Sequence, residues 1–319
     1  MSFIKSITCI LAVTAISTTT STAFAWGAVG HELIAYVGGD TATNGQEFWQ
    51  SNLDPLHQLT TVPDRIWKEP ATKPNEAPNH WFQVDHYYTS DKYFQIPLFP
   101  SSYEQAVSQY TEPIVTKNGT APWRIRELYQ MAINAFKIKN YSLALQYVGT
   151  MSHYIGDLSQ PLHVTENYDG QETNNVGIHM FFENENIGNE MPLRDEIKLR
   201  TQKLLKDPQF LSQFKGTLMD TLLNEVERSI SFKDVILAND TKYGRTGQGA
   251  AVQLELAKDR IADGAATFAL ILNRLWLDAA IELKASPMTI QDPQWIQNDY
   301  SDLTLENKSL IYGDDCAQN

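Results

Sequence analysis

The segment His153–His163 carries the most specific arrangement of chemically active side chains in the sequence, HYIGDLSQPLH. His153 and Asp157 are four residues apart, so on a helix both side chains leave the same face one turn apart. Pro161 ends such a helix and lets His163 fold back towards the other two side chains. Two imidazoles and a carboxylate in this arrangement are typical of a zinc-binding site.

A second pair with the same spacing follows in GIHMFFE, where His179 and Glu183 are again four residues apart. Upstream lie three further candidate ligands: His31, Asp64 in VPDR and His80 in NHWF. Five of the seven histidines therefore stand in contexts that could bind metal. We expect the remaining two, His57 and His86, to be structural or solvent-facing.

The elements that must position these residues are mainly helices. Apolar residues at helical spacing predict helices over residues 29–37, 122–136, 141–158, 195–206, 208–230 and 247–283. Residues 51–120 are rich in proline and lack β-branched alternation, which predicts long ordered loops rather than strands. Residues 165–192 are also loop-like, although 180–183 could begin a short helix. The prediction is an all-α fold: a single mainly helical domain with long loops, a design that usually carries a site.

The first 25 residues are predicted to be a signal peptide. Lys5 gives a positive start, residues 7–16 form a short apolar stretch, and Ala23-Phe24-Ala25 matches the A-x-A cleavage pattern. Since a bilayer needs roughly 20 apolar residues, the stretch is too short to span, although an uncleaved anchor remains an alternative. We expect cleavage after Ala25, a mature chain of residues 26–319 forming one catalytic domain, and a secreted or periplasmic location.

Charge and cysteine content limit the classes of partner. The net charge of −13 argues against non-specific grip on nucleic acid, yet it does not exclude a nuclease, because bound zinc ions bring positive charge to a site. With Cys9 removed in the signal peptide, Cys316 is alone, so no intramolecular disulfide can form. An idle thiol in a polar tail after Pro293 is expected, with a disulfide dimer as the alternative. No obligate protein partner is predicted.

Two motifs resemble the phospholipase C / P1 nuclease superfamily: WGAVGH at the expected mature N-terminus and HYIGDLSQPLH. The resemblance implies an α-helical secreted enzyme with long loops around a cleft that holds three Zn²⁺ ions. Nine residues would be the ligands: Trp26, His31 and Asp157 of the first ion; Asp64, His80, His153 and the bridging Asp157 of the second; His163, His179 and Glu183 of the third.

Trp26 would bind through its free α-amino group and its carbonyl oxygen, so signal cleavage would complete the site. An α-amino group has a reference pKa of about 8, and zinc readily displaces its proton. Two ions bridged by Asp157 can share a hydroxide, because metal lowers the pKa of water to roughly 7. We expect this hydroxide to attack phosphorus in line, with Asp64 as the residue that orients it or acts as base.

The substrate class is less sharply indicated. The spacing from Trp26 to His31 resembles the nucleases of the superfamily, whereas the short spacing from His163 to His179 and the final Glu183 resemble the phospholipases.

Two positions depart from the nuclease pattern. Where nucleases carry a phosphate-gripping arginine and a base-recognising aspartate, this chain has Trp67 and Gln83, although Arg65 or Lys68 could replace the arginine. We expect Arg65, Trp67 and Gln83 to contact substrate. Nearby aromatic residues could stack a base or surround a choline headgroup: Trp67, Trp81, Phe82, Tyr87 and Tyr88.

The sequence therefore predicts a zinc-dependent phosphodiester hydrolase, most simply a phospholipase C acting on phospholipid headgroup esters at a membrane surface or micelle. The first alternative is a single-strand-specific endonuclease or 3′-nucleotidase acting on nucleic acid or nucleotides. The second is a non-catalytic zinc- or lipid-binding protein that retains the scaffold.

Overall fold

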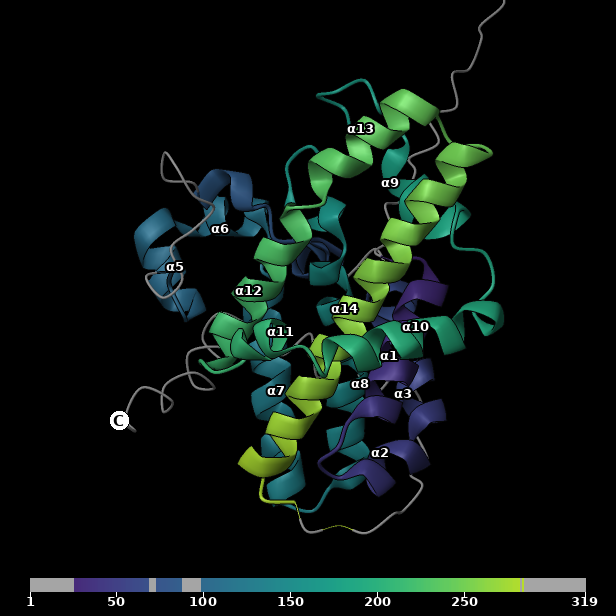
Figure 1. Cartoon of the computed structure of the whole chain (residues 1–319). Coiled ribbons are helices and arrows are strands. Elements are labelled where there is room, and N and C mark those ends of the chain that lie inside the picture. Colours follow the sequence, from purple (N-terminus) through teal and green to yellow (C-terminus); the bar gives the residue numbers. More distant parts are fainter. Residues whose placement is uncertain (1–25, 69–72, 88–98, 282, 284–319) are drawn as a thin grey trace, which may run out of the picture.

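The computed structural model describes residues 26–68, 73–87, 99–281 and 283 (Figure 1). The described residues are 75% helical and include no strand, which confirms the predicted all-α class. None of their helices is long and apolar enough to cross a membrane. The predicted signal peptide, Cys316 and the tail after Pro293 lie outside the described residues.

Helix α8 (Tyr141–Ser159) lies at the centre of the molecule, with every residue from 144 to 159 buried. Its first turn is capped by the side chain of Asn140, which accepts from the backbone N–H of Leu143. Its end is set by Pro161, which cannot continue the helix. Five neighbouring helices surround it: α1 (Ala28–Thr41), α3 (Leu53–Leu59), α7 (Ala121–Lys137), α12 (Leu218–Ile230) and α14 (Gln248–Asp278).

The first and last described helices pack against each other. Helix α14 has 31 residues, about 46 Å at 1.5 Å per residue, and in Figure 1 it runs along the length of the bundle. Helix α1 (Ala28–Thr41) crosses it at Gly38, where an added Cβ would lie 2.6 Å from the Phe268 ring. The small residue therefore permits a close approach, and α10 (Met191–Leu204) covers the pair.

Short helical elements occupy much of the region predicted to be loops. Between residues 46 and 118 these are, besides α3, the elements α2 (Gln46–Ser51), η1 (Pro63–Trp67), α4 (Lys73–Glu76), η2 (Ala77–His80), η3 (Val84–Tyr87), α5 (Tyr103–Tyr110) and α6 (Glu112–Asn118). The loop prediction was wrong for α5, because Ser102 and Gln105 form a capping box that starts a helix. Figure 1 shows α5 and α6 to one side of the main bundle.

The later part of the chain also differs in detail from the prediction. The expected helix over 208–230 is two helices, α11 (Pro208–Ser212) and α12, because Thr217 and Asp220 form a capping box that begins the second. Helix α13 (Lys233–Tyr243) was not predicted. The loop after α8 contains three short elements: η4 (Pro161–Val164), α9 (Ile178–Met180) and η5 (Phe181–Glu185).

Candidate metal centre

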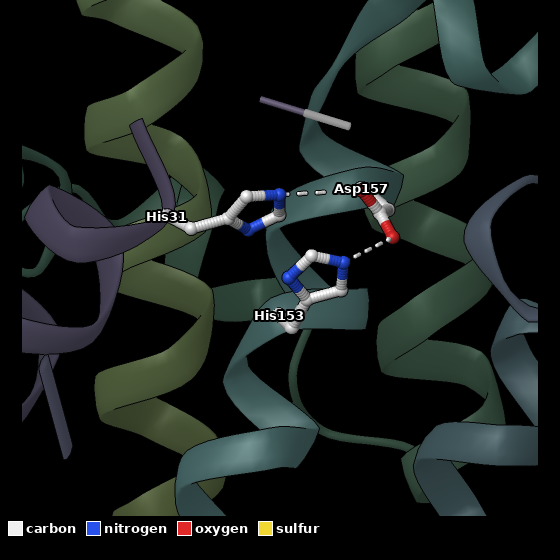
Figure 2. Close-up of side chains that lie close together, drawn as sticks. All are labelled: His31, His153 and Asp157. Atoms are coloured by element: carbon white, nitrogen blue, oxygen red, sulfur yellow. Dashed lines mark ion pairs between the residues drawn. The ribbon is translucent and has the colours of Figure 1, made fainter. Parts of the chain in front are cut away.

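His153 and Asp157 project from one face of α8, as their spacing predicts, and both are fully buried. His31 of α1 stacks on the His153 ring with 3.8 Å between ring centroids. The Nε2 atoms of both rings lie 3.5 Å from the Asp157 carboxylate, one on each oxygen. Figure 2 shows both imidazoles pointing at this carboxylate from two helices.

Asp64 and His80 approach the same carboxylate from two short elements. Asp64 lies in the π-helical turn η1, a geometry often found at functional sites. His80 ends η2, and its Nδ1 lies 3.2 Å from Asp157 Oδ2 and 3.6 Å from Asp64 Oδ1. His153 Nε2 lies 2.9 Å from the same Nδ1. Asp157 is thus placed between two groups of candidate ligands, where the resemblance puts a bridging carboxylate.

A third group forms where the chain folds back after α8. His163 lies in η4, and His179 and Glu183 lie one turn apart across α9 and η5. Glu183 Oε2 is 2.8 Å from His179 Nε2 and 3.4 Å from His163 Nε2. Each of three groups could hold a metal ion, because one ligand atom from each member lies within 4.8 Å of those of the others. The groups are His31, His153 and Asp157; Asp64, His80 and His153; and His163, His179 and Glu183.

Trp26 lies in the core beside this cluster. Its indole N–H donates to Ser159 Oγ at 3.0 Å, at the end of α8. The backbone N–H of Gly27 donates to the Glu183 carbonyl at 3.1 Å. The expected mature N-terminus is therefore tied to the two elements that carry Asp157 and Glu183.

Most of the imidazoles have one nitrogen committed to a partner behind the cluster. In three of them Nδ1 donates to a backbone carbonyl and Nε2 faces the cluster: His153 to Thr60, His163 to His80 and His179 to Tyr168. Such outer partners orient metal-binding histidines and fix the tautomer.

The buried polar atoms fit bound cations. Among the described residues, both nitrogens of His31, both oxygens of Asp157 and one oxygen of Glu183 are buried without a hydrogen-bond partner. A buried carboxylate without a partner costs several kcal/mol. Imidazole nitrogens and carboxylate oxygens are suitable donors for zinc, so metal ions would satisfy the atoms that the protein leaves unpaired.

The electrostatics also favour metal binding. Burial lowers the pKa of His31, His80 and His153 well below the usual range, which leaves neutral rings with a lone pair for metal. Burial, reinforced by the charge of Asp64, raises the pKa of Asp157 well above its usual range. A nearby cation would oppose that last shift, because it favours the ionised carboxylate.

The residues expected to contact substrate lie in different environments. Arg65 is exposed and Gln83 is half-buried, but Trp67 is only 1% exposed and lies under the Arg124 guanidinium. The structure therefore places Trp67 in the core rather than at a surface open to substrate. Lys68 is the cation at the cluster, since its ammonium lies 2.5 Å from Asp64 Oδ1.

The aromatic residues considered for substrate stacking are largely core residues. Phe82 and Tyr87 are buried and pack on each other, and Tyr88 lies outside the described residues. Trp81 is partly exposed, and its indole N–H donates to the Lys117 carbonyl. The exposed aromatic at the cluster is one that the prediction missed: Tyr168 is 44% exposed and lies edge-on to His179.

His57 and His86 lie away from the cluster, as predicted. His57 Nε2 is 2.9 Å from Glu190 and 3.7 Å from Glu32, and the other oxygen of Glu190 accepts from Arg194. These residues form a half-exposed ion-pair network in which Arg194 already neutralises the Glu190 carboxylate. His86 pairs with Glu166 at 3.2 Å.

An all-α bundle that gathers buried histidines and carboxylates able to hold metal ions is the arrangement expected of the phospholipase C / P1 nuclease superfamily. The sequence model of the S1/P1 nuclease family matches residues 26–276. The chain belongs to the S1/P1 nuclease family, and this membership indicates a phosphodiester hydrolase.

Two solved structures resemble the chain more distantly. The alpha-toxin of Clostridium perfringens from avian strain SWCP is 15% identical, with a TM-score of 0.45 over 79% of this chain and 63% of the toxin. The alpha toxin of Clostridium absonum is 13% identical, with a TM-score of 0.47 over 80% of this chain and 65% of the toxin. The chain thus spans less than two thirds of either toxin's length. No curated protein matches it by sequence.

Proposed function

We propose that the protein is a secreted, zinc-dependent nuclease that hydrolyses phosphodiester bonds of single-stranded nucleic acid or nucleotides. The observation that carries this proposal is the match to the S1/P1 nuclease family over residues 26–276, which includes every candidate ligand. The sequence alone favoured phospholipase C narrowly, because of the short spacing from His163 to His179 and the final Glu183, and because Trp67 and Gln83 depart from the nuclease pattern.

The three groups of ligands would hold three Zn²⁺ ions, with Trp26 completing the group of His31 and Asp157. Bound zinc would supply positive charge that lowers the pKa of water and neutralises phosphoryl oxygens. The Asp64 carboxylate, at the edge of the cluster, would orient the attacking water and accept its proton.

Lys68 is the residue we assign to the phosphate. Its ammonium already contacts a carboxylate oxygen at the cluster, and its side chain is 15% exposed. Once Asp64 is committed to a metal ion, the ammonium can turn to the anionic substrate one turn of helix from the ligand. This would supply the positive charge that the neutral indole of Trp67, at the position where the nucleases carry an arginine, cannot.

Phospholipase C is the second candidate. Glu183 at the last ligand position and the short spacing of sixteen positions from His163 to His179 favour it. Tyr168, exposed beside His179, suits either substrate, because an aromatic face can stack a base or bind a quaternary ammonium.

One zinc-loaded preparation tests these functions together. We expect hydrolysis of single-stranded DNA and of a chromogenic phosphodiester, loss of both on chelation, and recovery with zinc. Preferential cleavage of phosphatidylcholine micelles would transfer the assignment to phospholipase C. Absence of hydrolysis of all three substrates would leave a non-catalytic zinc- or lipid-binding protein.

Secretion is part of the same proposal, and the start of the family match at Trp26 supports cleavage after Ala25. Mass spectrometry of the exported protein should give Trp26 as the first residue. A variant with one extra residue before Trp26 should lack one zinc ion. Three ions bound to that variant would exclude the α-amino group as a ligand.

A further inference from the structure

The His80 imidazole is oriented differently from the other rings that have an outer partner. His153, His163 and His179 each use Nδ1 to reach a backbone carbonyl, whereas His80 turns Nδ1 towards the cluster and gives Nε2 to a carboxylate. That carboxylate is Glu76, whose Oε1 lies 2.8 Å from Nε2. The two residues are four apart across the junction of α4 and η2.

Glu76 is itself held firmly. It is fully buried, and its Oε1 also accepts from the Tyr154 hydroxyl at 2.6 Å. Its Oε2 accepts from the side-chain amide N–H of Asn79 at 3.3 Å. The side-chain oxygen Oδ1 of Asn79 in turn accepts from the Thr120 hydroxyl at 2.7 Å. Since Tyr154 belongs to α8, the carboxylate is fixed between η2 and the helix that carries His153 and Asp157.

We propose that Glu76 is a positioning residue of the metal centre, which commits His80 to bind metal through Nδ1. This inference rests on the proposed zinc centre. Without an acceptor at Nε2, a 180° flip of the ring about its Cβ–Cγ bond could place the carbon Cδ2, which cannot bind metal, where Nδ1 now faces the cluster. The hydrogen bond to Glu76 selects the tautomer with the proton on Nε2 and leaves the Nδ1 lone pair facing Asp64 and Asp157. A hydrogen bond from Nε2–H to a carboxylate also raises the basicity of the imidazole, so that Nδ1 binds a metal ion more strongly than it would with a carbonyl as the acceptor.

The test compares Glu76→Leu, which removes the acceptor, with Glu76→Gln, which keeps an acceptor oxygen of the same shape. Zinc is titrated into each full-length mature protein against a competing chelator, with no substrate present. We expect Glu76→Leu to weaken one of the three zinc ions by about 10- to 100-fold, and Glu76→Gln to restore part of that loss. Because no substrate is used, absence of phosphodiesterase activity would not affect this result.

The matched control is Glu225→Gln. Glu225 is a carboxyl equally buried, on α12, and belongs to none of the ligand groups. We expect it to leave all three zinc affinities unchanged. Equal losses in Glu225→Gln and Glu76→Gln would overturn the proposal, because they would reflect a general effect of replacing a buried carboxyl group.

Histidine tautomers give an independent readout if Glu76→Leu folds poorly. In zinc-loaded protein labelled with ¹⁵N-histidine, we expect the His80 proton on Nε2 in the wild type and in Glu76→Gln. Metal bound at Nε2 of His80 in the wild type would overturn the proposal, as would wild-type zinc affinity in Glu76→Leu.

Discussion

Two regions of this protein bury charged side chains, and they balance that charge in different ways. Between α12 and α14, Asp263 accepts from Arg228 at 2.7 Å and from Arg260 at 3.0 Å. Arg260 also donates to the Ser159 carbonyl and to Ser229 Oγ. The charge on Asp263 is therefore neutralised by side chains of the same chain.

The candidate metal centre has no such internal balance. Asp157 is as deeply buried as Asp263, yet neither of its oxygens has a hydrogen-bond partner among the described residues. Lys68 reaches Asp64 and is the only cation paired with a candidate ligand in the part of the chain described. The negative charge of a buried carboxylate can thus be neutralised by arginines of the protein or by cations bound from solution. Each arrangement predicts a different response to chelation.

Chelation should produce the largest effect. Removal of the metal ions leaves Asp157 and its neighbours buried without compensation, so we expect hydrolysis to be abolished and the melting temperature to fall by at least about 10 °C. Calorimetry and a phosphodiesterase assay with and without chelator measure both. Added zinc should restore them. A melting temperature unaffected by chelator would contradict the view that the cluster depends on external cations.

Asp64→Asn should separate catalysis from metal binding within the cluster. The amide keeps an oxygen that can bind metal but cannot accept a proton, so we expect most of the zinc to remain while kcat falls by about 10²- to 10⁴-fold. Metal analysis and steady-state kinetics on the same sample provide the measurement. An active Asp64→Asn enzyme would remove Asp64 from the catalytic role.

Asp263→Asn should break the region that is balanced internally. Removing the carboxylate leaves Arg228 and Arg260 buried without their partner, and breaking such a pair costs about 3 kcal/mol or more. We expect denaturant unfolding to show this loss while zinc content and the response to chelator stay as in the wild type. A simultaneous loss of zinc would show instead that the two regions are coupled, through the contact of Arg260 with Ser159.

Much of the metal centre could be predicted because its residues lie in short local patterns. The pairs His153–Asp157 and His179–Glu183 are each one helical turn apart, and the structure places both pairs in buried groups as expected. That the groups meet around Asp157 depended on the family resemblance, since no local pattern relates His31 to residues more than a hundred positions away.

The residues whose roles the sequence did not predict correctly act through tertiary contacts. Trp67 appeared available to substrate, but the Arg124 guanidinium packs over its ring from α7. The partnership of Glu76 with His80 has the signal of an i, i+4 spacing, yet proline-rich sequence around it indicated loops. The capping boxes that start α5 and α12 are also visible in the sequence, but the proline-rich composition around α5 indicated loops, and the helical spacing over 208–230 indicated one continuous helix.

A smaller effect is expected from the cation of the metal centre. Lys68→Met removes the ammonium beside Asp64, and a hydrogen bond to a charged group is worth about 1.5–3 kcal/mol, so we expect KM for a phosphodiester to rise by roughly tenfold or more. Arg65→Met on the same turn is the matched control, because it removes one positive charge from an exposed side chain that, among the described residues, forms no ion pair with a candidate ligand. If Lys68 rather than Arg65 binds the phosphate, Arg65→Met should change KM much less. Equal effects of the two variants would assign the phosphate contact to general surface charge.

The smallest expected effect concerns Glu225, a buried carboxyl of the α12–α14 region that, among the described residues, forms no ion pair with Arg228 or Arg260. Burial, and then the charge of Asp263, raise the pKa of Glu225 well above its usual range, so the folded protein holds a proton that the unfolded chain releases above about pH 4.3. The contribution of this group to stability is therefore complete below that pH and decreases as the pH rises.

Glu225→Gln cannot ionise and should remove this dependence. We expect equal melting temperatures for wild type and variant near pH 4, and a variant more stable by a few degrees at pH 7. Asp263 works in the opposite sense: burial disfavours its charge, but Arg260 and Arg228 outweigh burial and hold its pKa low, so its contribution is lost only as the pH falls below about 3.9. A Glu225→Gln variant less stable than the wild type at pH 7 would mean that Glu225 is ionised and paired, and that the arginines balance two carboxylates rather than one.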